Sequence, residues 1–426
     1  MNDQMNVKAQ MNVRALRSSH RADLCAIESP YAWRRLLVAL LLSTLGGVGM
    51  WSIIVALPAL QAEFGVSRAQ ASLAYTATMV GFGVSGIALG RMSDRWGIMV
   101  PVLLGTGALA FGFVAAAWAG NVALFSLAQG GLIGVGSAAT FAPLMADTSQ
   151  WFDRRRGMAV GIFASGNYLS GALWPPILQY GIDHAGWRYT YLVVAAVSLF
   201  VMLPLAAYLR RRPPLASPLQ RAAVQEMAPS PPVLGLSTNA LQALLLIAGV
   251  ACCVAMSMPQ VHIVAYCGDL GYGAARGAQM LSLMLACGIV SRLSFGFISD
   301  RIGGLRTLLL SSSLQGFALL LFLPFDGLAS LYLISALFGL FQGGIVPSYA
   351  IIIREYFPAH EAGARMSAVI TATLFGMALG GWMSGAIFDL TGSYRSAFLN
   401  GIAWNALNLT IAGLLLRRAT CAATRP

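Results

Sequence analysis

Arg292 is the residue of this 426-residue chain whose position most needs a chemical explanation. It lies in a long apolar run that begins near Gly277 and ends at Asp300 and Arg301. Because an α-helix rises about 1.5 Å per residue, Arg292 would lie roughly 12 Å in from that end. A charge at the centre of a bilayer costs on the order of 2.5–3.5 kcal/mol on insertion scales. A residue kept at that cost is by default a functional one.

A guanidinium is always charged, and its fork of N–H groups fits a carboxylate. No apolar run of the sequence carries an acidic residue at mid-depth, so the counter-ion of Arg292 is expected to be an anionic ligand. One cation suits a monocarboxylate better than a dicarboxylate. The alternative is an arginine held by helix carbonyls or lining water, and the sequence leaves that open.

Other polar residues inside apolar runs are candidates for the same cavity. His262 and Tyr266 are four residues apart, which places them on one helix face. His262 could contact substrate or a proton, or it could be a hydrogen-bonded interface residue. The remaining candidates either line the cavity or bridge helices: Asn167, Tyr168, Gln129, Gln342, Gln315 and Asn405.

Several kinds of chemistry have no support in the sequence. The six cysteines show no metal-type spacing, and no phosphate-binding glycine-rich loop with a lysine is present, so neither a cofactor nor ATP is expected. No arrangement of Ser, His and Asp suggests an enzyme. The net charge of +12 is spread over short loops, which argues against nucleic acid.

The composition indicates a protein whose main partner is the lipid bilayer. It is 58% hydrophobic and 10% charged, whereas soluble domains carry about 25% charged residues. A span needs about 20 apolar residues. Pro175 and Pro176, after Trp174, are expected to break the span that contains them. Twelve spans are predicted, at 36–58, 71–90, 98–118, 121–146, 157–180, 188–209, 240–264, 277–298, 305–324, 328–352, 366–388 and 396–416.

The predicted organisation is an N-terminal tail at 1–35, a six-helix bundle at 36–209, a linker at 210–239, a second bundle at 240–416 and a tail at 417–426. The linker is rich in Pro, Ala and Ser. The tail at 1–35 has no apolar core, so no cleavable signal peptide is expected.

Basic residues predict the orientation. With the N-terminus inside, the inner segments carry 22 of them and the outer loops only four, which are Arg68, Arg188, Arg276 and Arg395. Both termini are therefore expected to be cytoplasmic. The compact loops favour a location in the inner (plasma) membrane of a bacterium.

The two halves repeat. Residues 90–97 (GRMSDRWG) match 296–303 (GFISDRIG) at an offset of 206, and Asp183 and Gly186 match Asp389 and Gly392 at the same offset. Six spans per half give both halves the same orientation in the membrane. The predicted fold is an all-α membrane protein of twelve transmembrane helices in two pseudo-symmetric six-helix bundles.

The G-x-x-x-D-R-x-G loop, the twelve spans and the long central linker resemble the major facilitator superfamily over about 36–416. This resemblance implies a carrier with a site between the bundles and alternating access. Asp94, Arg95, Asp300 and Arg301 would then latch one conformation by pairing with helix ends. The alternative is that they only set topology.

A narrower resemblance is to the monocarboxylate porter and oxalate–formate exchanger group. It lies in residues 259–271, in Ser291-Arg292-Leu293 and in the loop from Trp151 to Gly157. In that group an arginine at the place of Arg292 is the carboxylate partner. The chain departs from the group at Gly288, where the mammalian branch has an acid, and in 366–388, where the oxalate branch has a lysine.

We therefore expect secondary transport of a small organic anion, a monocarboxylate, with proton symport or anion exchange and no requirement for an oligomer. A proton is the second candidate partner. The alternatives are an exporter of drugs or other hydrophobic compounds and, in another class, a non-transporting membrane sensor. A bare Arg292 argues against cationic drugs, and the tail and linker are too short for a signalling domain.

Overall fold

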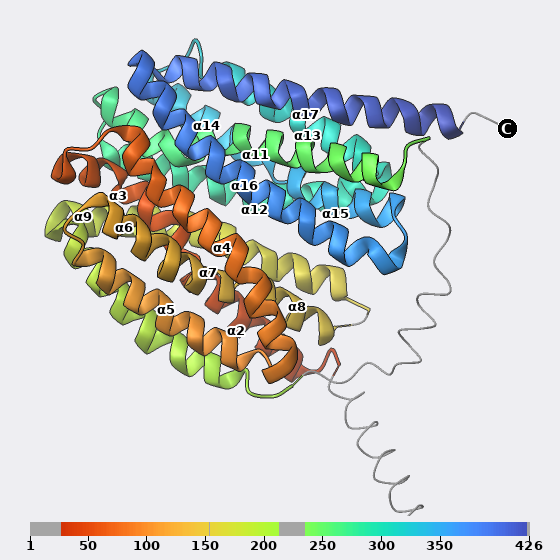
Figure 1. The fold of residues 1–426 in the computed structure, drawn as a ribbon, viewed down its shortest axis with the longest axis horizontal. Coiled ribbons are helices and arrows are strands. Elements are labelled where there is room, and N and C mark those ends of the chain that lie inside the picture. The colour runs from red at the N-terminus through yellow and green to blue at the C-terminus, as the bar shows by residue number, and fades with distance from the viewer. Residues whose placement is uncertain (1–26, 153, 213–234, 424–426) are drawn as a thin grey trace, which may run out of the picture.

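The computed structural model describes residues 27–152, 154–212 and 235–423, and every regular element in these ranges is a helix. They form two bundles, coloured red to yellow-green and green to blue in Figure 1. The first bundle contains α2 (Pro30–Gly46), α3 (Val48–Phe64), α4 (Arg68–Trp96), α5 (Met99–Ala117), α6 (Val122–Ala128), the π-helix η1 (Gln129–Gly134), α7 (Val135–Ala139), α8 (Ala142–Gln150) and α9 (Arg156–Tyr208). The second contains α11 (Thr238–Asp269), α12 (Ala274–Ile302), α13 (Gly304–Leu321), α14 (Leu328–Gln342), α15 (Ile345–Tyr356), α16 (Ala359–Thr391) and α17 (Tyr394–Ala423).

The helices confirm the expected fold class. Within the described residues, 11 helical segments are long and apolar enough to cross a membrane. One of them, in α9, holds two spans, because the chain turns at Gly186, whose φ of 80° and ψ of 157° are not helical. The first span begins at Pro30, earlier than the predicted residue 36, with Ser29 as its N-cap. Most of the predicted linker, at 213–234, and residues 1–26 of the tail lie outside the described residues.

The sequence repeat has a structural counterpart at one end of the molecule. Gly97 ends α4 with φ 85° and ψ 165°, and Gly303 ends α12 with φ 81° and ψ 168°. Each donates its backbone N–H to a serine carbonyl four residues earlier. Such φ values are open to glycine and strained for other residues. The two matching turns therefore adopt one conformation, as the repeat predicts.

The predicted break at Pro175 and Pro176 is wrong, because α9 stays helical through both residues. Each proline removes one backbone N–H and so frees the carbonyl four residues earlier. The Ala172 carbonyl, freed by Pro176, accepts a hydrogen bond from the Ser282 hydroxyl of α12. A partner in the other bundle thus compensates for the lost bond.

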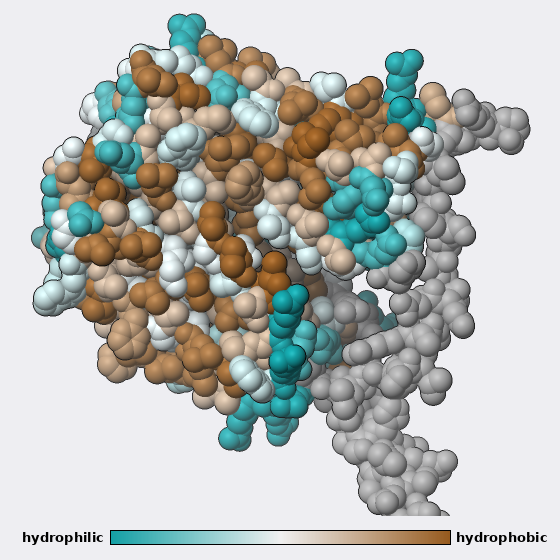
Figure 2. Space-filling model, viewed as in Figure 1, coloured by the Kyte–Doolittle hydropathy of each residue, from teal (hydrophilic) through white to brown (hydrophobic). Residues whose placement is uncertain are grey.

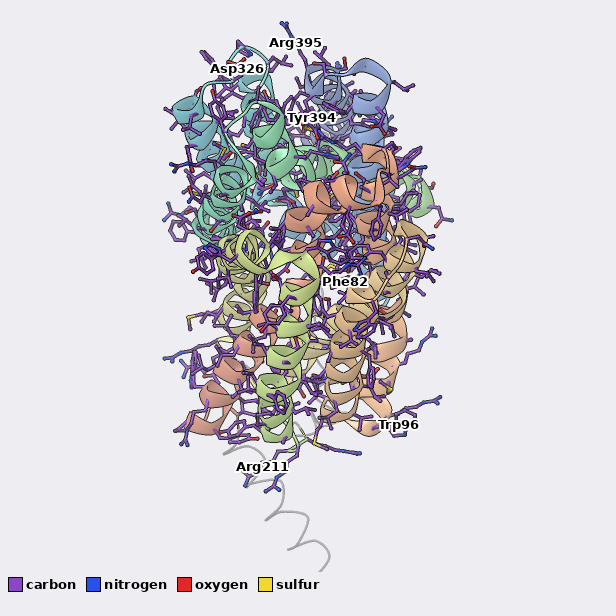
Figure 3. The ribbon with its side chains drawn as sticks, turned by 90° about the vertical axis from the view of Figure 1, so that its left-hand side faces the viewer. Phe82, Trp96, Arg211, Asp326, Tyr394 and Arg395 are labelled. Atoms are coloured by element: carbon purple, nitrogen blue, oxygen red, sulfur yellow. The ribbon has the colours of Figure 1, made fainter. Side chains whose placement is uncertain are left out.

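The two ends of the bundles differ in their charges. The basic end carries four arginines beside Asp94 and Asp300, namely Arg91, Arg95, Arg301 and Arg306, whereas at the far end Arg68 and Arg188 are paired with Asp269 and Glu63. Figure 3 shows Asp326, Tyr394 and Arg395 at the top, on the second bundle, and Trp96 and Arg211 at the bottom, on the first. Between the ends the surface is largely apolar (Figure 2), with Phe111 73% and Phe200 75% exposed, as expected for lipid contact.

The bundles meet along two seams, α4 against α16 and α9 against α12. The first seam runs from Arg68 and Asp389 to Gly83, where an added Cβ would lie 3.5 Å from Leu374. The second runs from Ser282 to Arg292. An added Cβ at Gly90 or Gly296, nearer the basic end, would meet nothing within 4 Å. The seams are therefore closed at the far end, and in Figure 1 α4 and α16 separate away from it.

Candidate substrate site

Arg292 lies on α12 in the second seam, about one turn before Gly296, where an added Cβ would meet nothing within 4 Å. It is partly exposed, and its Nη2 donates to the Tyr168 hydroxyl of α9 at a long 3.4 Å. The guanidinium carbon also lies 4.5 Å from the centre of the Tyr168 ring, in cation–π geometry. The Nε atom is buried and has no hydrogen-bond partner in the described part of the chain. A buried, unpaired N–H of a cation has unused capacity for an acceptor.

No acidic side chain among the described residues pairs with Arg292. The ion pairs found there join Arg35 to Asp147, Arg68 to Asp269, Arg188 to Glu63 and Arg365 to Glu361. Arg292 contacts an aromatic ring in place of a carboxylate. The charge that the sequence places in the middle of a span is therefore not neutralised by a described side chain.

Gly288 makes the contact between Tyr168 and Arg292 sterically possible. It lies one turn before Arg292 on α12, and a Cβ added there would overlap the Tyr168 ring. The position where the mammalian branch of the resembling group carries an acid is thus filled by an aromatic ring from the opposite bundle. Gly288 leaves space beside α12, and the Tyr168 ring fills that space.

Asn167 is adjacent to Tyr168 on α9 and is partly exposed. Its side chain makes no hydrogen bond to another described residue. Its amide remains free for a ligand or for water. Of the predicted site residues, Tyr168 and Arg292 meet across the second seam, and Asn167 is next to Tyr168 in the sequence.

His262 and Tyr266, on α11, lie in another region. His262 is fully buried, with Nε2 2.8 Å from the Gly381 carbonyl and Nδ1 3.1 Å from the Tyr394 hydroxyl. Tyr266 packs edge-on against Tyr394, with ring centres 5.3 Å apart. His262 is about 7 residues from the far end of its helix and Arg292 about 18, so they differ by roughly 16 Å in depth. Both ring nitrogens of His262 are already used, so we leave it out of the anion site.

Four predicted glutamines and asparagines lie within single bundles. The Gln129 Nε2 donates to the Tyr191 hydroxyl at 3.4 Å, and the Gln342 Oε1 accepts from Gln260 at 2.8 Å. Such contacts bridge helices of one bundle, so we leave Gln129 and Gln342 out of the anion site as well. Gln315 bonds to the Cys252 carbonyl and Asn405 to the Ser312 carbonyl, again within one bundle.

The four predicted gating residues lie at the basic end, where all are exposed: Asp94, Arg95, Asp300 and Arg301. No ion pair joins them to another described residue. Arg301 instead lies over the Phe297 ring at 4.2 Å. A pocket of about 390 Å³ along the last turns of α4 includes Asp94 and Arg95 in its lining. It is bounded by this one helix and lies away from Arg292.

Sequence reasoning missed a cluster at the far end. Arg68 was placed in an outer loop, yet it is 9% exposed and pairs with Asp269. Asp389 was used only as a landmark of the repeat, yet it accepts from the backbone N–H groups of Arg68 and Ala69 at 3.0 and 2.7 Å. The signal available in the sequence was a lone arginine at the start of a span, at a position where the second half has Ala274.

Comparison with known proteins identifies the family. The sequence model of the Major Facilitator Superfamily matches residues 39–331 and 293–422. The chain belongs to this superfamily. Its members are transporters, so the expectation that the chain is not an enzyme is confirmed.

Relatives of this superfamily chain include monocarboxylate transporters. Mouse (Mus musculus) monocarboxylate transporter 11 is 30% identical over 328 residues, which cover 72% of the chain and 70% of the relative. Monocarboxylate transporter 13 of Bos taurus is 28% identical over 72% of the chain and 71% of its own length. An MFS-type transporter of Aspergillus niger is 24% identical over 72% and 69%. The resemblance to the superfamily and to its monocarboxylate group is confirmed.

Solved structures agree on the fold. A peptide transporter in complex with sulfate superposes with a TM-score of 0.74 at 15% identity, covering 95% of this chain and 98% of its own. A bacterial homologue of the human lysosomal transporter Spinster, inward-facing and unoccupied, has a TM-score of 0.69 at 15% identity, over 92% and 97%. At such identities the likeness concerns the fold alone.

Proposed function

We propose that this superfamily transporter carries a small organic anion with one carboxylate, and that Arg292 binds that carboxylate. The observation that carries the proposal is the buried Nε of Arg292, which has no partner among the described residues, on a cation that no described acid neutralises. A bidentate carboxylate would use Nε and one terminal nitrogen, the usual geometry of such pairs. The names of the mammalian relatives support this substrate class.

Tyr168 is proposed as the partner of Arg292 when the site is empty. The 3.4 Å contact and the ring beneath the guanidinium offer weaker stabilisation than a carboxylate does. A bound anion would replace the hydroxyl contact while the ring could remain. Because Tyr168 and Arg292 belong to different bundles, an anion that replaces their contact changes the interactions that hold the two bundles together at the second seam. Asn167, next to Tyr168, is the second polar group proposed for the bound anion.

Transport by alternating access fits this arrangement. The site lies where the second seam ends, on the side from which the bundles separate, and rocking the bundles would expose it to the other side. Asp94, Arg95, Asp300 and Arg301 would pair with helix ends when the basic end closes. We propose that the basic end is cytoplasmic and that the protein works in the plasma membrane.

Two coupling modes are compatible with an arginine that has no acidic partner. In proton symport the anion is carried together with a proton, and uptake rises as the outside pH falls. In exchange only the loaded, near-neutral carrier crosses easily, and uptake is accelerated by anion on the opposite side. Flux measured with a pH gradient, and separately with internal anion, separates the two modes.

An exporter of hydrophobic compounds is the second candidate function. The Aspergillus niger relative, an MFS-type transporter, is not named for a carboxylate substrate, so relatives of this chain extend beyond the monocarboxylate transporters. A site with an unneutralised arginine would repel cationic compounds. A panel that includes neutral and cationic compounds beside the carboxylates decides between the two candidates.

The deciding experiment is uptake of labelled carboxylates into proteoliposomes that contain the purified protein. R292A is expected to abolish anion uptake, and R292K is expected to retain a small part of it, because a lysine keeps the charge and loses the fork. R276A, which removes an exposed far-end arginine, serves as the matched control and should transport normally. Near-normal uptake by R292A with correct insertion would refute the anion site.

A further inference from the structure

The far end of the first seam holds an ion-paired cluster that neither the family nor the proposed anion site accounts for. We propose that Arg68, Asp269, Asp389 and Tyr394, here called the Arg68 clasp, form the gate that keeps the far end closed. Arg68 comes from the first bundle, and its three partners come from the second. The inference rests on alternating access as proposed above and is independent of what Arg292 binds.

The guanidinium of Arg68 is held from several sides. Its Nη2 donates to Asp269 Oδ1 at 3.1 Å, its Nη1 also contacts Asp269, and Nη1 donates to the Tyr394 hydroxyl at 2.8 Å. The Phe388 ring lies 4.2 Å from the guanidinium carbon. Only the Nε bond, to Gln61 at 3.1 Å, stays within the first bundle. Most of the bonds therefore cross the seam and must break if the bundles part at this end.

Asp389 adds a second link at the same place. It accepts from the backbone N–H groups of Arg68 and Ala69, the first residues of α4. The first N–H groups of a helix have no partner within the helix, and the helix dipole favours a negative charge there. Asp389 comes from the other bundle, so α4 is capped across the seam in addition to its own cap, Ser67.

The clasp continues inward to His262. The Gly381 carbonyl can only accept, so we assign the hydrogen of the neutral ring to Nε2 of His262, which leaves Nδ1 as an acceptor. The Tyr394 hydroxyl can then donate to Nδ1 while it accepts from Arg68. The hydrogen bonds run in one direction from Arg68 through Tyr394 to His262 and Gly381. A role for His262 in the transport cycle would therefore act through the clasp.

The second seam has no such link at its far end. Asp183 corresponds to Asp389 in the repeat, but it accepts from Gln179 of its own helix at 2.8 Å. Ala274, the first residue of α12, stands at the position of Arg68, and the N-cap of this helix, Gly273, makes no side-chain cap. Among the described residues, no ion pair joins α9 to α12. In the described part of the chain, an ion-paired cluster of this kind is therefore present at the far end of the first seam and not at that of the second.

The test measures how often the far end opens, without reference to substrate. Ser72 of α4 is fully buried in the first seam, and its hydroxyl lies 3.0 Å from a Cβ added at Gly385. In a variant with the six native cysteines replaced, S72C is reacted in nanodiscs with a hydrophilic maleimide. Adding R68A is expected to raise the labelling rate by about tenfold or more, because it removes the charge-assisted bonds of Arg68 to Asp269 and Tyr394 from the closed state. D269N and D389N should each raise it as well.

Arg188 provides the matched control. It also makes a far-end ion pair, 2.7 Å from Glu63, but both residues belong to the first bundle. R188A should leave labelling at position 72 unchanged. The reversed pair R68D with D269R should return labelling toward the parent rate, and it shows that the effect comes from the pair and not from misfolding.

The clasp is refuted if R68A, D269N and D389N all leave labelling unchanged, or if R188A raises it equally. Because labelling needs no substrate, this result is distinguishable from failure of the anion site. Failure of that site appears as normal uptake by R292A, whatever the labelling rate. If R68A does not fold, D269N and D389N decide, since each leaves the arginine in place.

Discussion

At the scale of single residues, Arg292 was expected to lack a counter-ion from the protein. In the structure its guanidinium lies against the aromatic ring of Tyr168. The sequence suggested Tyr168 only as one of several polar candidates. What sets Tyr168 apart is its contact with Gly288, because its ring packs against α12 at a position where glycine leaves room for it. Such pairings across a seam depend on how two helices from different bundles are rotated, and that rotation is absent from local sequence patterns.

G288A tests this complementarity. The added methyl group overlaps the Tyr168 ring, so either the ring leaves Arg292 or the seam widens. We expect uptake to fall by about tenfold or more, because overpacking in a filled site costs about 1–3 kcal/mol. The measurement is initial uptake per inserted protein.

G296A is the control on the same helix, because a Cβ at residue 296 meets open space. It should transport as the parent does. Combining G288A with Y168A removes the overlap and should recover the stability lost in G288A alone. Full activity of G288A would contradict the role given to this glycine.

At the scale of helices, the order of the spans, the pairing of loop motifs and the two bundles could be predicted from apolar length and the repeat at offset 206. The span boundaries were less accurate, since α2 begins at Pro30 and α16 runs from Ala359 to Thr391, beyond the predicted 366–388. The behaviour of α9 at its two prolines could not be predicted. The prolines were expected to break the span, whereas α9 stays helical and Ser282, which is distant in sequence, donates to the carbonyl that Pro176 frees. This contact is tertiary, and no window of the sequence around Pro176 contains it.

A double-mutant cycle on Ser282 and Pro176 measures this effect. S282A leaves the Ala172 carbonyl without its donor and should destabilise the protein by about 1–3 kcal/mol. In a P176A background the carbonyl regains a helical partner, so S282A should cost clearly less. Unfolding midpoints of the four proteins in one detergent give the coupling. Equal costs in both backgrounds would show that the hydroxyl does not compensate for the proline.

At the scale of the whole molecule, the two bundles share their topology but differ in the buried side-chain contacts that stabilise them. The first has a buried ion pair, Arg35 with Asp147, at 2.9 Å and with side chains 3% and 6% exposed. The second has Leu241 at an offset of 206 and Ile352 at an offset of 205, the offset at which Trp151-Phe152 matches Tyr356-Phe357, and both are buried in its apolar core. The sequence placed Arg35 in an N-terminal tail. It could not show the pair, because the partner is 112 residues away and lies on another helix.

Removing one partner of the Arg35–Asp147 pair should destabilise the protein more than replacing both partners with apolar residues. R35A leaves a buried aspartate without a partner and is expected to cost about 3–5 kcal/mol, whereas R35L with D147I copies the second bundle and should cost much less. Thermal unfolding in detergent measures both variants. A double variant as unstable as R35A would show that the two bundles cannot exchange their core residues.

The glycine turns described above have a consequence for the motion of the far end. Gly97 and Gly303 share one conformation, whereas Gly186, with ψ 157°, and Gly392, with ψ 10°, do not, and the far-end clasp spans only the seam beside Gly392. The clasp ties the far end of α4 to the second bundle beside α16, and among the described residues no ion pair ties α9 to α12. While the clasp is closed, spin labels on α9 and α12 should therefore separate further at this end than labels on α4 and α16, and R68A should remove that difference. The arrangement of the helices would follow the two-fold repeat, whereas the movement at the far end would differ between the two seams.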